Sequence, residues 1–388
     1  MASIKLKGDT SGEVIISAPS VAGNTTLELP ATSSTLATQN SLGLRNLIIN
    51  GDMNIDQRNA GASATTTSNV YTVDRFQLYA ADVTNAQTYQ QVTDAPAGFN
   101  KSLKITNSST AQAAGSAALY TPRQRIEGYN TAHLNWGTSD AQTVTVSFWV
   151  KASVTGTYPF AINNGSFNRS FVSNYTISSA NTWEYKTVTV AGDTSGTWNV
   201  NNSSGMIVMF SLDTNSSYET STVDAWQTGS FRATSSNVHF LANASATWQI
   251  TGVQLEANTT ATPFEHLQFG QQLALCKRYY EHSYPYGTVA GASNGGLGAK
   301  HIVVGLTRPN NYGIETVFYT VEKRASATVV MYTYGGLAGS ISNGDSGAVI
   351  ATADAIQNST NGFLPRQTGG TTLAAQAYIY HYSASSEL

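Results

Sequence analysis

Six histidines, one cysteine and a few short motifs are the parts of this sequence whose chemistry could support catalysis. No histidine has another histidine or the cysteine at a spacing typical of a metal site, and no HExxH motif occurs. The segment from Gly291 to Gly295 (GASNG) matches the GxSxG pattern of a serine nucleophile. Its flanks are rich in glycine and have no helical period, which predicts a loop rather than the required strand–turn–helix. The sequence therefore predicts no catalytic residue.

The stretch from Asp52 to Asp56 (DMNID) begins like a calcium-binding loop. Gln57 stands where an EF-hand has glycine, and Ser63 stands where it has its bidentate glutamate, so an EF-hand is excluded. A looser structural calcium site stays open, beside the alternative that these carboxylates meet only water. The other acidic residues are scattered, although the separation of a hydrolytic pair is set by the fold. We assign no metal and no cofactor.

Aromatic side chains are the residues that could bind a ligand, because exposed rings stack on sugars while amides and hydroxyls bind sugar hydroxyl groups. Trp136 and Trp198 lie in polar stretches rich in turn residues, whereas the other tryptophans lie in or beside strand patterns. Five tyrosines towards the C-terminus are further candidates for glycan or receptor contact: Tyr284, Tyr286, Tyr312, Tyr332 and Tyr334. Packing inside the protein is the alternative for each of these residues.

The elements that must position these residues are predicted to be mostly β-strands. Thr, Val, Tyr, Phe and Trp are frequent, and their side chains suit pleated sheets. In TVTVSFWVKA, Val144, Val146, Phe148 and Val150 share one face. Many such strands at short spacing, with no amphipathic helices between them, predict a β-sandwich or jelly roll over residues 43–266.

The regions on either side of this domain also have strand patterns, so the predicted fold class is all-β. Residues 1–42 carry short alternating pieces around Ile4, Val14 and Leu27, separated by turn residues. This segment is too short to bury a core of its own, so it must pack on copies of itself or on an attachment partner, or else form a loose leader. Residues 283–388 predict a C-terminal β-sandwich tip domain.

One short helix is predicted, over residues 267–282. Its apolar stripe consists of Phe269, Leu273, Cys276 and Tyr280, at positions i, i+4, i+7 and i+11. The stripe is compatible with two arrangements that the spacing does not separate. The helix either caps the domain that it follows, or forms a seam where copies of the chain meet.

Composition excludes several classes of function. The formal net charge of −3 offers no basic field for phosphates, so we expect no nucleic acid partner. No apolar stretch approaches the length of a membrane span, so we expect no membrane insertion. A single cysteine cannot form a disulfide within the chain. Charged residues make up only 11%, and uncharged polar residues take their place, which suits an extracellular or virion setting.

Several passages, in order along the chain, resemble appendage proteins of tailed bacteriophages. NLIINGDMNIDQRN and YTVDRF resemble the start of a module common in those proteins, TVSFWVKA and ITGVQLEANTTATPFEH resemble its middle and end, and CKRYYEHSYPYG resembles the linker that follows. GEVIISAPSVAGNTTLELPATSSTLATQ is similar to their attachment or stalk repeats. The resemblance implies a jelly roll similar to carbohydrate-binding modules, in a virion appendage that is usually trimeric. Thr251-Gly252 stands where related modules often carry a calcium-binding acidic pair.

From these features we expect a non-enzymatic structural protein of a phage virion, a fibre-like appendage that recognises host-surface glycan. Residues 1–42 would attach it to other tail or collar proteins, and the chain would form a homotrimer. It would be assembled in the host cytoplasm and exposed on the particle. One alternative is a head decoration, collar or baseplate protein without receptor contact. The other is a polysaccharide depolymerase.

Overall fold

The computed structural model describes residues 3–7, 13–17, 44–117, 119–304, 316–368 and 376–388. Contacts divide the chain into two units, Met1–Leu42 and Gly43–Leu388. In the first unit, β1 (Ser3–Lys7) and β2 (Glu13–Ser17) form an antiparallel hairpin in which Ile4 pairs with Ile16. The third expected strand, around Leu27, lies outside the described residues. No helix among the described residues is long and apolar enough to cross a membrane.

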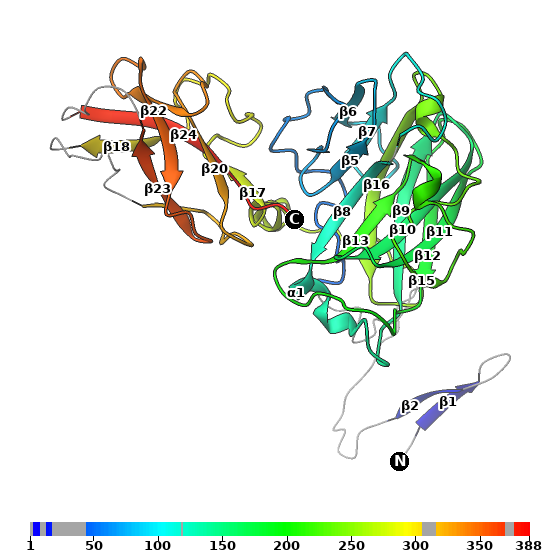
Figure 1. Ribbon diagram of the computed structural model, residues 1–388. Helices are drawn as coiled ribbons and strands as arrows, with labels where there is room; N and C mark the ends of the chain where they lie inside the picture. Colours follow the sequence, from blue (N-terminus) through cyan, green and yellow to red (C-terminus); the bar gives the residue numbers. More distant parts are fainter. Residues whose placement is uncertain (1–2, 8–12, 18–43, 118, 305–315, 369–375) are drawn as a thin grey trace. The chain divides into compact units, whose positions relative to one another are not determined.

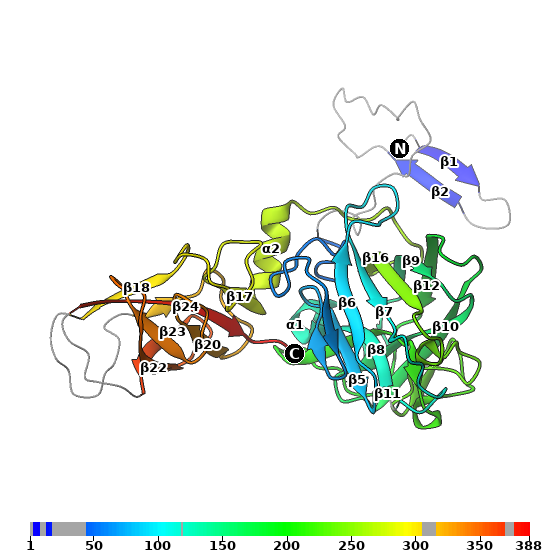
Figure 2. The same ribbon diagram turned by 90° about the horizontal axis from the view of Figure 1, so that it is seen from above.

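Two antiparallel sheets form the central jelly roll of the second unit (Figures 1 and 2). The larger sheet has the order β15-β11-β10-β13-β8-β5-β4, with β14 paired to β8, and the smaller sheet has the order β12-β9-β16-β7-β6-β3. The strands of the larger sheet are β4 (Val70–Tyr71), β5 (Gln77–Ala81), β8 (Leu119–Glu127), β10 (Gly156–Asn164), β11 (Arg169–Ile177), β13 (Ser204–Phe210), β14 (Asp213–Thr214) and β15 (Trp226–Thr228). Those of the smaller sheet are β3 (Ala64–Thr66), β6 (Gln87–Val92), β7 (Ser102–Thr106), β9 (Val144–Ala152), β12 (Glu184–Val190) and β16 (Thr247–Glu256).

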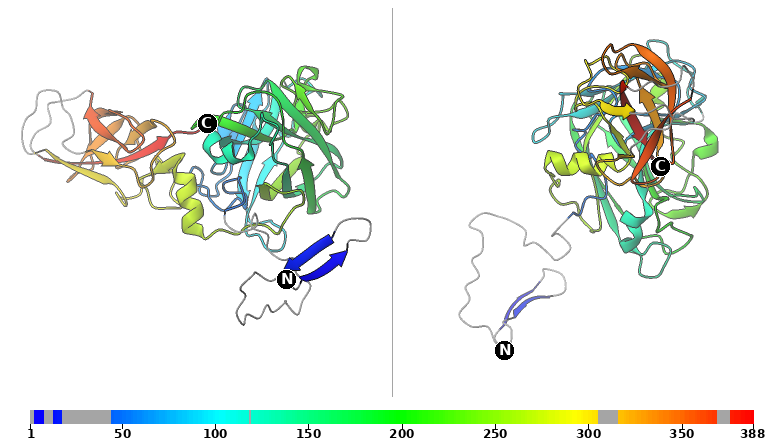
Figure 3. Two further views of the ribbon diagram at one scale, coloured as in Figure 1. Left: turned by 90° about the horizontal axis from the view of Figure 1, so that it is seen from below. Right: turned by 90° about the vertical axis from the view of Figure 1, so that its left-hand side faces the viewer.

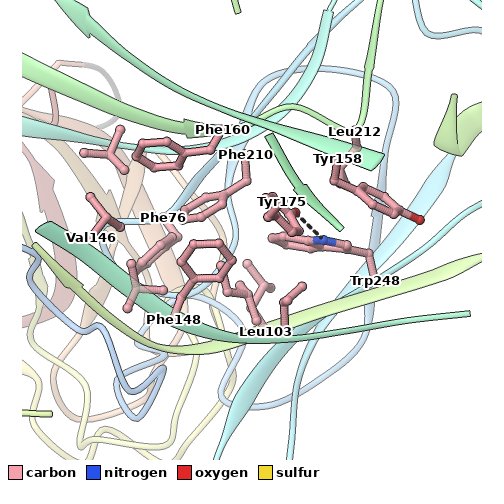
Figure 4. Packing of buried hydrophobic residues seen from close by; sticks show 14 of the residues in the cluster. Phe76, Leu103, Val146, Phe148, Tyr158, Phe160, Tyr175, Phe210, Leu212 and Trp248 are labelled. Atoms are coloured by element: carbon pink, nitrogen blue, oxygen red, sulfur yellow. Dashed lines mark hydrogen bonds between the residues drawn. The ribbon is translucent and has the colours of Figure 1, made fainter. Parts of the chain in front are cut away.

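The core of the jelly roll lies between these sheets. The predicted alternation of β9 is present, since Val144, Val146, Phe148 and Val150 are all fully buried. The Phe148 ring lies 5.0 Å from that of Phe210 on β13, which joins the two sheets (Figure 4). The predicted all-β fold class is confirmed. Short helical turns interrupt the strands only at α1 (Gly128–Thr131), η2 (Ala132–Leu134), η3 (Ser216–Tyr218) and η4 (Phe240–Ala242) in the described part of this domain.

The linking helix is shorter than predicted. Helix α2, the yellow-green helix in Figure 3, covers Phe269–Lys277, and Tyr280–His282 form β17 instead of a further helical turn (Figure 2). Pairing of β17 with the last strand of the chain overrides the helical period there. Cys276 and Tyr280 are buried within the single chain, so these two residues do not form an exposed stripe with Phe269 and the half-buried Leu273. This burial agrees with the alternative in which the helix packs on its own domain. Contact between copies through the remaining stripe residues stays a prediction.

The C-terminal region is a second β domain with its own core. Its long strand β24 (Gln376–Ser385) pairs with β18 and β21 through its first half and with β17 and β20 through its second half. Tyr378, Tyr380 and Tyr382 of β24 are buried in this core. The other strands are β18 (Lys300–Val304), β19 (Val317–Phe318), β20 (Thr328–Tyr332), β21 (Ser340–Asn343), β22 (Val349–Ile356) and β23 (Gly362–Gln367).

Candidate functional site

An open cavity of about 610 Å³ lies where the start of the jelly roll meets helix α2. Its lining combines carboxylates, amides, one lysine, one histidine and two aromatic rings. The lining residues are Asp52, Asn54, Ile55, Asp56, Ala60, Gln91, Asn100, Lys101, His266, Leu267, Phe269, Gln272, Tyr286 and Gly287. Polar groups and aromatic rings converging on one hollow are typical of ligand sites.

The polar side of the cavity is the loop from Asn50 to Gln57, and its position is fixed by strand β16. Gly51 lies so close to β16 that a Cβ atom there would come within 2.0 Å of the Val253 carbonyl oxygen, so only glycine fits. Val253 donates its backbone N–H to the Gly51 carbonyl (2.9 Å). The Asn50 side chain closes the loop, because it accepts from the Ile55 N–H (2.8 Å) and donates to the Ile55 carbonyl (2.9 Å). The loop is therefore a rigid support for Asp52 and Asp56.

The two carboxyl groups are buried and held by protein donors. Asp52 accepts from Gln272 Nε2 at 2.6 Å and from Asn54 Nδ2 at 2.5 Å. Asp56 accepts from the backbone N–H groups of Asn59 (2.9 Å) and Gly61 (2.8 Å). Burial raises the pKa of both carboxyl groups, because removing water disfavours the charged form, and these hydrogen bonds offset part of that shift.

Two aromatic rings lie on the open side of the cavity. Phe269, at the start of α2, is 50% exposed, and Tyr286 is 45% exposed. Their rings meet edge to face, with centroids 5.1 Å apart at 85°. The Tyr286 hydroxyl donates to the Asn54 carbonyl at 3.0 Å, which ties the ring to the polar loop. Large apolar faces this exposed, beside fixed amides and carboxylates, provide stacking and hydrogen bonding at one place.

The structure brings together two residues that the sequence assigns to different roles. Tyr286 was predicted to contact glycan and Phe269 to lie in an oligomer seam, and both line the cavity. Tyr284 is instead buried, with its ring stacked on His381 (3.8 Å between centroids, 12° between planes). Tyr332 and Tyr334 are half-buried and do not line the cavity. Tyr312 lies outside the described residues.

The two tryptophans predicted to be exposed are buried. Trp136 and Trp198 pack edge to face at 4.7 Å, and both pack on Trp226 at 5.2 and 5.4 Å. The indole nitrogen of Trp136 donates to the Gln142 carbonyl (2.7 Å). A small hollow of about 140 Å³ adjoins the pair. Both tryptophans therefore pack inside the protein, which is the alternative to ligand binding that the sequence leaves open.

The serine motif lies in a loop, as the sequence predicts. The segment from Gly291 to Gly295 lies in turns, with neither a strand directly before it nor a helix directly after it. Within the described residues, no three His, Cys, Asp or Glu side chains gather as metal ligands would. The Asp52 and Asp56 oxygens accept hydrogen bonds from the protein instead.

Sequence reasoning missed most of the polar lining. Asp52, Asn54 and Asp56 attracted notice only as a partial calcium loop, while Gln91, Lys101 and Gln272 carry no motif. Asp52 and Gln272 are joined across 220 positions of sequence. The available signal was Gly51 directly before Asp52, which marks a place where the backbone approaches another segment closely.

Comparison with known proteins gives only distant matches to solved structures. No protein-family model matches the chain, and no curated protein matches it. Among solved structures, the tailspike protein 4 enzymatically active domain of bacteriophage CBA120 aligns at 13% identity and a TM-score of 0.29, over 55% of this chain and 21% of that one. This chain thus spans about a fifth of that tailspike domain. The CBM22-1 xylan-binding domain from Paenibacillus barcinonensis aligns at 10% identity and a TM-score of 0.24, over 52% and 97% of the two chains. A family 11 carbohydrate-binding module from Clostridium thermocellum aligns at 10% identity and a TM-score of 0.26, over 50% and 97%.

Proposed function

We propose that this chain is a non-enzymatic glycan-binding protein, with the saccharide held in the cavity between the Asn50–Gln57 loop and helix α2. The observation that carries the proposal is the pair of half-exposed rings, Phe269 and Tyr286, over a lining of fixed carboxylates and amides. A sugar ring has one apolar face and a girdle of hydroxyl groups. It needs a stacking surface and hydrogen-bonding groups at one place, and this cavity offers both.

Hydrolysis is the second candidate, because Asp52 and Asp56 lie in the same cavity and burial raises the pKa of both. A general acid does need a raised pKa. However, Asp52 and Asp56 both accept hydrogen bonds from protein groups, and those to Asp52 join the loop to the helix. That use of the oxygens favours a structural role for the carboxylates and binding as the function.

The test is calorimetric titration of the full chain against a panel of neutral, acidic and amino-sugar oligosaccharides, with product analysis of each mixture. We expect saturable binding of at least one glycan and no new reducing ends. New reducing ends would replace the binding assignment with a depolymerase. The absence of binding to every member of the panel would favour a purely structural protein.

We further propose that the protein is a trimeric appendage on the virion of a tailed phage, attached through residues 1–42. The order of the passages that resemble such appendages supports this, and several identical sites would multiply a weak affinity for a surface glycan. Light scattering should give three times the 41.2 kDa chain mass for the full-length protein. A monomer at all concentrations would contradict the trimer.

A further inference from the structure

The larger sheet carries a second polar cluster on the face turned away from the main core. On that face Arg123 is directly opposite Met209, and Arg125 is directly opposite Ile207. Met209 and Ile207 belong to a small apolar cluster with Ala161 and Val172, separate from the main core. Because directly paired residues point to the same side of a sheet, both arginines lie on this outer face.

Three guanidinium groups gather there around aromatic rings. Arg232, in the loop after β15, lies over Phe167 (4.7 Å to the ring centroid) and Tyr218 (4.6 Å). Arg125 lies 5.4 Å from the centroid of the same Phe167 ring, and Arg123 lies over Tyr79 at 4.0 Å. The three positive charges therefore share one small region of the sheet.

Within the described part of the chain, no carboxylate pairs with any of these three arginines. Among the described residues, Arg123 and Arg232 donate only to the neutral partners Gln77 Oε1 (2.8 Å) and Ser230 Oγ (3.1 Å). Three of their nitrogen atoms are buried with no acceptor in the part of the chain that the structure describes: Nε of Arg125, and Nε and Nη1 of Arg232. Arg232 is itself 94% buried, since 6% of its surface is exposed.

More buried polar atoms without partners lie along the same row of the sheet. Asn163 is paired with Ile207 on one side and with Ser170 on the other, so it shares the face of Arg125. Asn163 and Ser170 are both fully buried. Both side-chain amide atoms of Asn163, and the hydroxyl of Ser170, have no hydrogen-bond partner within the described residues.

Such a cluster is costly for the folded chain alone. Each unpaired buried donor carries a desolvation penalty, and like charges in a water-poor region repel one another. Burial, followed by the nearby Arg125 and Arg232, lowers the pKa of Arg123 to about 9. A bound oxyanion would accept from the free N–H groups and offset the repulsion.

We propose that Arg123, Arg125 and Arg232 form an anion site that takes an oxyanion, a phosphate or carboxylate group, either as a free ion or as the acid group of a charged saccharide. Guanidinium groups match both kinds of oxyanion, because their N–H donors form a planar fork. The site shares no residue with the cavity, so it can exist whether or not the cavity binds glycan.

The test is thermal unfolding of the full chain in inorganic phosphate, compared with chloride at matched ionic strength. A specific site raises Tm progressively once the phosphate concentration exceeds the dissociation constant, because the ion binds the folded chain only. The variants are Arg125→Gln, at a half-buried position, and Arg232→Gln. The control is Arg366→Gln, which removes an arginine that pairs with Asp354 in the C-terminal domain.

We expect the phosphate-dependent rise in Tm in the parent chain and in Arg366→Gln. In the other two variants we expect the rise to begin at phosphate concentrations at least about tenfold higher, which corresponds to an affinity about tenfold weaker. Equal shifts in all four proteins, or equal shifts in phosphate and chloride, would overturn the proposal. Thermal unfolding in glucuronate and in glucose then distinguishes the acid group of a saccharide from a free ion. Stabilisation by glucuronate but not by glucose supports a saccharide acid group, and stabilisation by phosphate alone supports a free ion.

Discussion

His381 is a buried imidazole in the second β domain, and its surroundings oppose its protonation. The ring stacks on Tyr284, Nδ1 lies 3.0 Å from the Ser283 hydroxyl, and Nε2 has no hydrogen-bond partner among the residues that the structure describes. Burial, and secondarily the nearby His282, lowers the pKa of His381 to about 4, from an ordinary value of 6.5. The unfolded chain therefore binds a proton between these values that the folded chain rejects.

Stability of this domain should consequently depend on pH. The contribution of His381 is fully present above about pH 6.5 and is lost as the pH falls towards 4, up to about 3 kcal/mol. Asp74 has the opposite effect on stability in part of this pH range. Burial raises its pKa to about 6, so the folded chain binds a proton there more readily than the unfolded chain does. The difference between the parent and His381→Phe, which keeps a stacked ring but cannot take a proton, isolates the histidine. Urea unfolding at several pH values should show that difference changing between pH 4 and 6.5, and a constant difference would contradict the assignment.

The segment after β24 ties the C-terminal β domain to the jelly roll. Glu387 accepts from Arg58 Nη2 at 3.0 Å and from Arg75 Nη1, and both arginines belong to the jelly roll. The Tyr71 hydroxyl donates to the Leu388 backbone carbonyl oxygen at 2.9 Å. The side chain of Glu387 is only 7% exposed, so this is a buried ion pair with two arginines.

Removing the charge of Glu387 should therefore be costly. Glu387→Gln leaves Arg75 without its carboxylate, and breaking one side of a buried pair costs about 3 kcal/mol. Asp354→Asn is the matched control, because it breaks the half-exposed pair with Arg366, worth at most about 1 kcal/mol. Urea denaturation should show a clear loss for the first variant and little for the second. Similar losses of unfolding free energy for both variants would mean that the buried pair stabilises the fold no more than the half-exposed pair does.

At the scale of single elements, the sequence predicted correctly those features that neighbouring residues determine, and it failed where residues distant in the sequence determine the structure. The alternation in Val144–Val150 gave the correct strand and the correct buried face, because that pattern is set by neighbouring residues. The predicted end of helix α2 was wrong, because Tyr280 forms a strand pair with Ser385, more than 100 positions away, and the local pattern does not reveal that partner. Trp136 and Trp198 were misplaced for a similar reason, since their partner Trp226 comes from a strand whose neighbours the sequence does not identify.

At the scale of the whole molecule, the candidate cavity exists only because distant segments meet. Its residues come from positions 52–60, 91, 100–101, 266–272 and 286–287. From residue type and position alone, Tyr286 is a candidate for glycan contact, and the structure places it in the lining of the cavity. The juxtaposition of Tyr286 with Phe269 and Asp52 required the folded chain, because no period or motif links these positions.

The most direct measurement of the central claim is the affinity of the best glycan for Phe269→Ala and Tyr286→Ala, beside Tyr185→Ala. Tyr185 is a suitable control because it is 45% exposed, as Tyr286 is, but lies on β12 outside the cavity. Loss of a stacking ring costs on the order of 1 kcal/mol or more, so we expect affinity about tenfold weaker in each cavity variant and unchanged in the control. Full affinity in both cavity variants, or a loss as large in Tyr185→Ala, would contradict the account.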